Sequence, residues 1–239
     1  MASILLRRPR AANRVNLRMA EELALACAAI NQDDAIRCVM LSGSGDVFSA
    51  GWETPPVTPA AGLSRYQAAI AIASLHAPVV AAINGDAIGQ GLELALAADL
   101  RIAASTAHFA MPQVGHGLLP WDGGTQRLAR IVGRAYALEL LLTGETVDAA
   151  TALRMGLVNR LAPPQELRQA VDAVVGQVIA AAPIAIRYAK EAVRDGAELA
   201  LAQGLRLEAD LTILLQGTKD RAEGIRSFME RRPAVFRGE

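Results

Sequence analysis

Short apolar runs alternate with segments of helical periodicity through the first half of the chain. The runs end at glycine or polar residues, as buried strands do, and the segments between them repeat apolar positions every three to four residues. The pattern predicts strands at 3–6, 36–41, 78–83 and 100–103, a short extended piece at 47–51, a proline-rich loop at 54–62, and helices at 16–30, 64–75 and 90–98. This alternation favours parallel strands joined by crossover helices, an α/β fold.

From residue 124 onward the pattern changes to one helix after another. Helices are predicted at 125–132, 135–142 and 148–155, each ending at a glycine, then a strand at 158–161 and a helix through 167–178. Pro183 suits the first residue of a helix, and Asp220 followed by Glu223 predicts a capping box. We place a boundary near residue 181, which gives a core of 1–180 and a helical domain of 181–239. Its many Leu and Ile residues predict packing on another subunit.

The composition is typical of a globular protein with a large hydrophobic core. The 239 residues are 52% hydrophobic and 20% charged with a formal net charge of +0, which predicts a large core and no broad binding to nucleic acid or membrane surfaces. The two cysteines fall in core-like segments, and no apolar run has the length of a membrane span, so a cytoplasmic location is expected. No two histidines have ligand spacing on one helix, so no metal site is predicted.

The segment 87–93 is the strongest candidate for a functional site. It follows the strand at 78–83, and its glycines precede a helix whose first amide hydrogens have no partner within the helix. Backbone donors there would hold a negatively charged ligand oxygen, and Glu93 lies on the first turn beside them. A glycine turn that serves only close packing is the plainer alternative. A dinucleotide site is excluded, because position 94 is Leu and no acidic residue follows about twenty residues on.

Several segments together resemble the enoyl-CoA hydratase/isomerase (crotonase) family, from about Leu6 to the C-terminus. The segments that carry the resemblance are Leu6-Arg7-Arg8-Pro9, Phe48-Ser49-Ala50-Gly51, Ala81-Ala82-Ile83-Asn84-Gly85 with Glu93-Leu94-Ala95, Gly117-Leu118-Leu119-Pro120 with Gly123-Gly124-Thr125-Gln126-Arg127, Leu142-Thr143-Gly144, and Glu230-Arg231-Arg232-Pro233.

The resemblance implies a spiral of strand-strand-helix turns with a C-terminal helical domain that forms trimers or hexamers. It implies a CoA thioester as substrate, no cofactor, and an oxyanion hole of two backbone amides, which by position belong to Trp52 and Gln90. It further implies substrate contacts at Ser49, Ala50, Gly51, Gly89, Gly91 and Trp121. Trp121 is large for its position, so we expect it to fill part of the acyl pocket and restrict substrate size.

The chain departs from the family at one catalytic position. Family hydratases use two glutamates, of which one matches Glu93 and the other falls at Gln113. Glutamine can orient water but cannot exchange a proton. Either Glu93 does the acid–base work alone while Gln113 positions water, or Asp122 replaces the missing carboxylate, or the enolate is used differently. The alternative for Asp122 is a cap for the helix at Thr125.

The sequence thus predicts a lyase that hydrates an enoyl-CoA or dehydrates the product, with Glu93, Gln113 and Asp122 as candidate catalytic residues. An isomerase, a thioester hydrolase or a decarboxylase of the same family is the first alternative. The second is a catalytically weak protein that binds acyl-CoA, which the loss of the carboxylate at Gln113 favours.

Overall fold

A five-stranded parallel sheet forms the centre of the molecule. The computed structural model describes residues 1–53 and 64–239. The sheet has the order β1-β2-β3-β5-β8, built from β1 (Ala2–Leu6), β2 (Val39–Gly43), β3 (Val79–Ile83), β5 (Leu100–Ala104) and β8 (Arg160–Ala162). All four neighbouring pairs are parallel, for example with Leu41 opposite Ala81. The order in space follows the order in sequence, so each new strand is added at the same edge.

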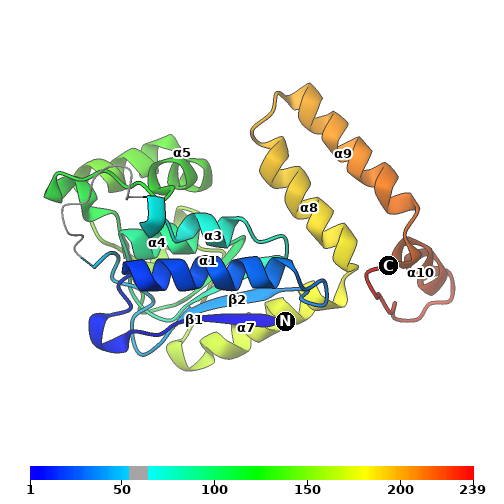
Figure 1. Ribbon diagram of the computed structural model, residues 1–239, viewed down its shortest axis with the longest axis horizontal. Helices are drawn as coiled ribbons and strands as arrows, with labels where there is room; N and C mark the ends of the chain where they lie inside the picture. The colour runs from blue at the N-terminus through cyan, green and yellow to red at the C-terminus, as the bar shows by residue number, and fades with distance from the viewer. Residues whose placement is uncertain (54–63) are drawn as a thin grey trace.

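Both faces of the sheet are buried. Alternate residues of each strand point to opposite sides, and helices cover each side. Val39 and Leu41 pack against α1 (Leu17–Asn31), α3 (Ala69–Ala73) and α4 (Gln90–Leu96) in one cluster. Met40 and Val80 pack against α7 (Leu167–Ala180) in a second cluster on the other face. Figure 1 shows α1, α3 and α4 above the sheet and α7 beneath it. Burial on both sides explains why the strands are continuous apolar runs.

A second, smaller sheet lies next to α4. It consists of β4 (Ala87–Ile88), β6 (His108–Ala110) and β7 (Val147–Asp148), with β4 and β6 parallel and β6 and β7 antiparallel. Two helices belong to the same stretch of sequence. The first is α5 (Gly124–Thr143), which is kinked at Gly133, and the second is α6 (Ala149–Arg154), which directly follows β7. Short 3-10 helices η1 to η4 span Pro9–Ala11, Ser64–Tyr66, Pro112–His116 and Pro164–Glu166.

Three helices extend away from the sheet at the C-terminal end. They are α8 (Pro183–Gly196), α9 (Leu201–Gln216) and α10 (Lys219–Met229), with α8 and α9 packed as a hairpin (Figure 1). The chain bends by 106° between 164–180 and 183–196, next to the boundary placed near residue 181. Whether 181–239 behaves as a separate domain stays a prediction.

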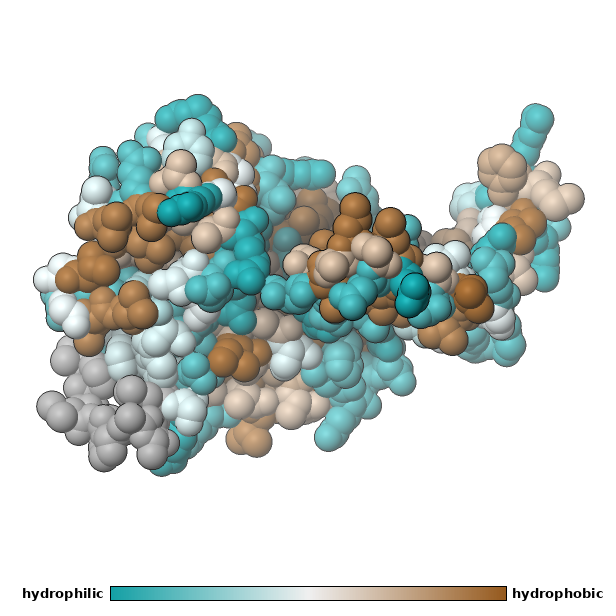
Figure 2. Space-filling view, turned by 90° about the horizontal axis from the view of Figure 1, so that it is seen from above, coloured by the Kyte–Doolittle hydropathy of each residue, from teal (hydrophilic) through white to brown (hydrophobic). Residues whose placement is uncertain are grey.

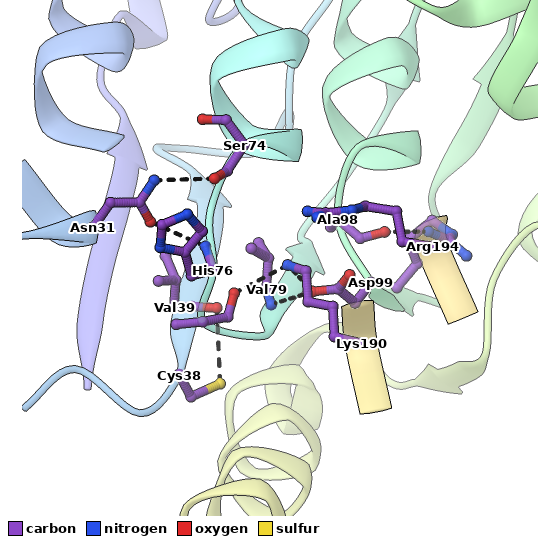
Figure 3. Close-up of polar contacts among 12 residues, drawn as sticks. Asn31, Cys38, Val39, Ser74, His76, Val79, Ala98, Asp99, Lys190 and Arg194 are labelled. Carbon is purple, nitrogen blue, oxygen red and sulfur yellow. Dashed lines mark hydrogen bonds and ion pairs between the residues drawn. The ribbon is translucent and has the colours of Figure 1, made fainter. Parts of the chain in front are cut away.

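Lys190 ties α8 to the core. Its ammonium donates to Asp99 Oδ2 at 2.7 Å and to the carbonyl of Ala77 at 3.1 Å, and Asp99 Oδ2 also accepts from the backbone N–H of Val79 at 2.7 Å. Figure 3 shows this junction, where Lys190 of α8 meets Asp99 and the start of β3 at Val79. The Lys190 side chain is only 9% exposed, whereas that of Asp99 is 33% exposed. The tie fixes where the C-terminal helices leave the sheet.

The C-terminal helices expose large apolar side chains. Figure 2, which looks down on the top of Figure 1, shows apolar atoms gathered at the tip of the α8–α9 hairpin. Exposed residues of this region include Leu199, Leu201, Leu205, Ile213, Leu214, Phe228 and Met229. Such a surface is typical of an interface, but the expected trimer or hexamer stays a prediction. In the described part of the chain no single helix is long and apolar enough to cross a membrane, and one bent pair, 164–180 with 183–196, passes that test.

Three local predictions differ from the structure. The expected strand at 36–41 is β2 at Val39–Gly43, because pairing with β1 and β3, not the apolar run, sets its ends. The expected helix at 64–75 is a 3-10 turn followed by the short α3. The capping box of Asp220 and Glu223 is wrong, since Thr218 caps α10 by accepting from the N–H of Arg221. The predicted loop at 54–62 lies outside the described residues.

Replacing Gly176 with Ala is expected to stabilise the protein by up to about 1 kcal/mol, because glycine is a poor helix former. Gly176 lies in the exposed face of α7, and a Cβ built on it meets nothing within 4 Å. The melting temperature should rise by roughly 2–4 °C for a chain of this size. A thermal melt of the two proteins checks this, and a fall in melting temperature would contradict it.

Candidate active site

Glu93 is a buried carboxylate held by one of its two oxygens. It lies on the first turn of α4 with no exposed surface. Its Oε1 accepts from the backbone N–H groups of Asp122 and Gly124, both at 2.8 Å, while its Oε2 is buried and has no hydrogen-bond partner among the described residues. Burial raises the pKa of Glu93 to about 7, although the two backbone donors oppose this shift. Near neutral pH the group can therefore both accept and donate a proton.

Two loops meet at the start of α4. The segment after β2 pairs with β4 through a bridge between Ser49 and Ala87. A Cβ built on Gly91 would overlap the carbonyl oxygen of Ser49, so only glycine permits this contact. Gly89 has φ +56°, a conformation that glycine adopts without strain and that turns the chain from β4 into α4. These glycines hold the segments 49–52 and 89–91 against each other.

The backbone amides of Trp52 and Gln90 are both free within the described part of the chain. The bonds beside Trp52 run from Val15 N to Gly51 O and from Glu53 N to Val15 O, which leaves the Trp52 N–H without an acceptor. Gln90 is the first residue of α4, so its N–H has no partner within the helix. A Cβ built on Gly51 would lie 3.5 Å from Gln90 N, which brings the two loops together at this point.

Gln113 lies beside the turn that leads into α4. It belongs to the 3-10 helix at Pro112–His116, and its Nε2 lies 3.5 Å from a Cβ built on Gly89. Its Oε1 is buried and has no hydrogen-bond partner in the part of the chain that the structure describes, and the same holds for Oε1 of Gln90, Oε2 of Glu93 and Nε1 of Trp52. Buried polar atoms are normally paired. Four exceptions on residues predicted for one site indicate a place where a polar ligand completes the bonding.

An aromatic cluster adjoins these groups. The ring of Trp52 lies 4.9 Å from that of Trp121 and 5.7 Å from that of Tyr66, measured between centroids. Gln67 also donates to the carbonyl of Trp121 at 3.2 Å. The bulk of Trp121 is thus placed against Trp52, one of the two residues with a free amide. Its predicted effect on substrate size stays a prediction.

The carboxylate of Asp122 is fully engaged. It accepts from the backbone amides of Ala68, Ala69 and Ile70 and from the side chain of Gln90. The structure therefore gives no support to Asp122 as the acid–base group that replaces the missing glutamate. The alternative, a cap for the helix at Thr125, is wrong as well, because Gly123 precedes that helix without a side-chain cap. Asp122 caps α3 instead, from far away in the sequence.

The predicted substrate-binding residues divide into two groups. Gly51, Gly89 and Trp121 lie beside the free amides and the aromatic cluster. The hydroxyl of Ser49 donates to the carbonyl of Asn13 at 2.9 Å, Ala50 N donates to the carbonyl of Ala12, and Gly91 packs on Ser49. These three residues shape the loops, and their contact with substrate stays a prediction. Among residues 1–53 and 64–239 no group of three or more His, Cys, Asp or Glu could hold a metal.

Known proteins share this fold. A crystal structure of enoyl-CoA hydratase from Bacillus anthracis superposes with a TM-score of 0.95 at 35% identity, covering 99% of this chain and 95% of that one. A crotonyl-CoA hydratase from Syntrophomonas wolfei is 37% identical over 99% of this chain and 94% of its own length. A short-chain-enoyl-CoA hydratase from Clostridium acetobutylicum is 32% identical over 97% of this chain and 92% of its own.

These likenesses assign the architecture to the crotonase fold, as the sequence predicted. The family model for enoyl-CoA hydratase/isomerase matches residues 1–239. The chain belongs to the enoyl-CoA hydratase/isomerase family and is an enzyme of that family.

Proposed function

We propose that this enzyme adds water to the double bond of a short enoyl-CoA thioester, or removes it in the reverse direction. The observation that carries the proposal is the buried Oε2 of Glu93, which has no partner among the described residues and lies on the same helix turn as the amide of Gln90. The names of two relatives, a crotonyl-CoA hydratase and a short-chain-enoyl-CoA hydratase, support the substrate class.

The two free amides would hold the thioester oxygen. As the nucleophile adds, negative charge develops on that oxygen in an enolate. The N–H groups of Trp52 and Gln90 are fixed before the reaction by the contacts of their loops. Each such donor in a dry site is worth on the order of 3 kcal/mol in the transition state.

Glu93 would move one proton twice. As carboxylate it takes a proton from water while the water oxygen bonds to the β-carbon. As carboxylic acid it then gives that proton to the α-carbon, which neutralises the enolate and completes the addition of one water. The pKa of about 7 suits both halves. Gln113 Oε1 would accept the second hydrogen of the water and so orient it.

A panel of enoyl-, dienoyl- and hydroxyacyl-CoA thioesters, read by mass spectrometry, tests the proposal. We expect the product of crotonyl-CoA to gain the mass of one water. Release of CoA, loss of CO₂ or a shifted double bond without gain of water would overturn hydration in favour of another enolate reaction. Binding without turnover would point to an acyl-CoA-binding protein, the candidate that Gln113 favours.

Replacing Gln113 with Glu is expected to raise the rate of crotonyl-CoA hydration by about 10²-fold, the lower range for a positioned general acid or base. The change restores a second proton-exchanging group beside the turn at Gly89. The loss of crotonyl absorbance over time measures the rate. Gln113→Met is the control, because it fills the same volume without hydrogen bonds. A Glu variant no faster than the wild type would contradict the prediction.

A further inference from the structure

Asp122 connects three parts of the active site through its side chain. Its Oδ2 accepts from the backbone amides of Ala68 at 2.7 Å and Ala69 at 2.8 Å, and its Oδ1 accepts from Ile70 at 3.3 Å. The residue before α3, Ala68, has no side chain that could cap the helix. A carboxylate is a strong acceptor for the free amides of a helix start. Asp122 therefore fixes where α3 begins.

Gln90 extends this linkage to the start of α4. Its Nε2 donates to Asp122 Oδ2 at 2.9 Å and to the carbonyl of Tyr66 at 2.7 Å. The same residue supplies one of the two amides proposed to hold the thioester oxygen. The side chain of Gln90 thus joins that amide to Tyr66, whose ring packs on Trp52. No pattern around residue 90 predicts a role for this side chain.

The backbone of Asp122 reaches Glu93. Its N–H donates to Glu93 Oε1 at 2.8 Å, and its carbonyl accepts from Arg127 Nη1 at 2.8 Å. Because Oε1 is held in this way, Oε2 is the oxygen left for the reaction. Any displacement of Asp122 would shift Glu93 and Gln90 together.

We propose that Asp122 is a positioning residue that sets the relative placement of Glu93 and the amide of Gln90, with the side chain of Gln90 as its partner. The proposal rests on the proposed function, since it takes these two groups as the reacting machinery. It assigns Asp122 a role without proton transfer, because both oxygens of its carboxylate already accept hydrogen bonds from this chain.

The charge of Asp122 also acts on Glu93. Burial is the largest cause of the raised pKa of Glu93, the negative charge of Asp122 raises it further, and the positive charge of Arg127 on α5 lowers it. The other elements packed on α4, namely α3 and β4, carry no charged side chain. Neutralising Asp122 should therefore lower the pKa of Glu93, an effect that a purely structural cap elsewhere would not produce.

The test compares Asp122→Asn with the wild type. Asparagine keeps the shape and loses the charge. Infrared difference spectra against Glu93→Gln give the titration midpoint of the Glu93 carboxyl without any turnover. We expect the midpoint to move to lower pH, and kcat to fall by about 10²-fold, as for a misplacement near 1 Å, with little change in KM. An unchanged midpoint with unchanged kcat would overturn the proposal.

Two further variants separate positioning from folding. Asp220→Asn is the matched control, because Asp220 is also buried and accepts two backbone amides, those of Arg237 and Gly238, far along the chain. It should leave the Glu93 midpoint and kcat unchanged. If Asp122→Asn does not fold, Gln90→Met tests the proposal instead, because it removes the hydrogen bond to Asp122. A fall in kcat with an unchanged KM supports the proposal. A kcat equal to that of the wild type overturns it. If Glu93→Gln stays active, the proposed function fails while the midpoint shift still tests Asp122.

Discussion

Replacing Glu93 with Gln is expected to lower kcat for enoyl-CoA hydration by about 10³-fold and to make the folded protein more stable above pH 7. The loss of activity follows from the loss of the proton-transfer group, since Gln113 cannot take over the exchange. The shape of the site should survive, because Gln can still accept from the N–H groups of Asp122 and Gly124.

The gain in stability follows from the pKa of Glu93. The ordinary value is 4.5, and in the folded protein it is raised to about 7. The folded state therefore keeps a proton that the unfolded state has released between these values. The stabilisation from Glu93 is complete below pH 4.5 and is lost as pH rises through about 7. At higher pH the buried carboxylate costs on the order of 3 kcal/mol, which Gln avoids.

Urea denaturation of both proteins at pH 5 and pH 8 measures this difference. The Gln variant should exceed the wild type at pH 8 and match it more closely at pH 5. A difference that does not depend on pH would contradict the raised pKa, whatever the activity shows. A lower kcat together with a higher stability in the Gln variant would show that Glu93 serves catalysis and lowers the stability of the folded protein.

Replacing Gly91 with Ala is expected to lower kcat/KM on the order of 10²-fold, because it would displace one of the two amides proposed to hold the thioester oxygen. The added methyl group would overlap the carbonyl oxygen of Ser49 and lie 2.8 Å from its carbonyl carbon. Since backbone atoms cannot rotate away, the segment 49–52 and the start of α4 must separate. Overpacking of this kind also costs about 1–3 kcal/mol of stability.

Steady-state kinetics and a thermal melt of the Gly91→Ala protein check both effects. Gly176→Ala is the matched control, since it makes the same change on an open face of α7. Folded Gly91→Ala with kcat/KM close to the wild type would show that the contact between Ser49 and Gly91 does not position the amides.

Much of the fold could be predicted from the sequence because the signals are local. The apolar run at 78–83 and the periodic segment at 167–178 match β3 and α7 to within two residues. What could not be predicted depends on partners far along the chain. The helix expected at 64–75 is broken by the carboxylate of Asp122, which caps α3 at Ala68–Ile70. No sequence feature near residue 68 predicts a contact with Asp122.

The same reason limited the prediction of the site. Glu93 and Gln90 are three residues apart and lie on one helix turn, so their closeness in space could be predicted. The Gln90 side chain and Tyr66 were missed, because Gln90 donates to the backbone carbonyl of Tyr66 and to the distant carboxylate of Asp122, and no local sequence pattern indicates either partner. The capping box at Asp220 failed likewise, because that carboxylate accepts from the C-terminal residues Arg237 and Gly238.

The order of the central sheet has a consequence for synthesis. Because the order β1-β2-β3-β5-β8 is also the order in which the strands leave the ribosome, each strand finds its partner already made. The sheet can lengthen at one edge without waiting for later parts of the chain, which avoids trapped arrangements of unpaired strands. The candidate site residues Gly51, Gln90, Glu93, Gln113 and Asp122 leave the ribosome before β8 and α7. The groups proposed to react are therefore made before α7 covers the second face of the sheet.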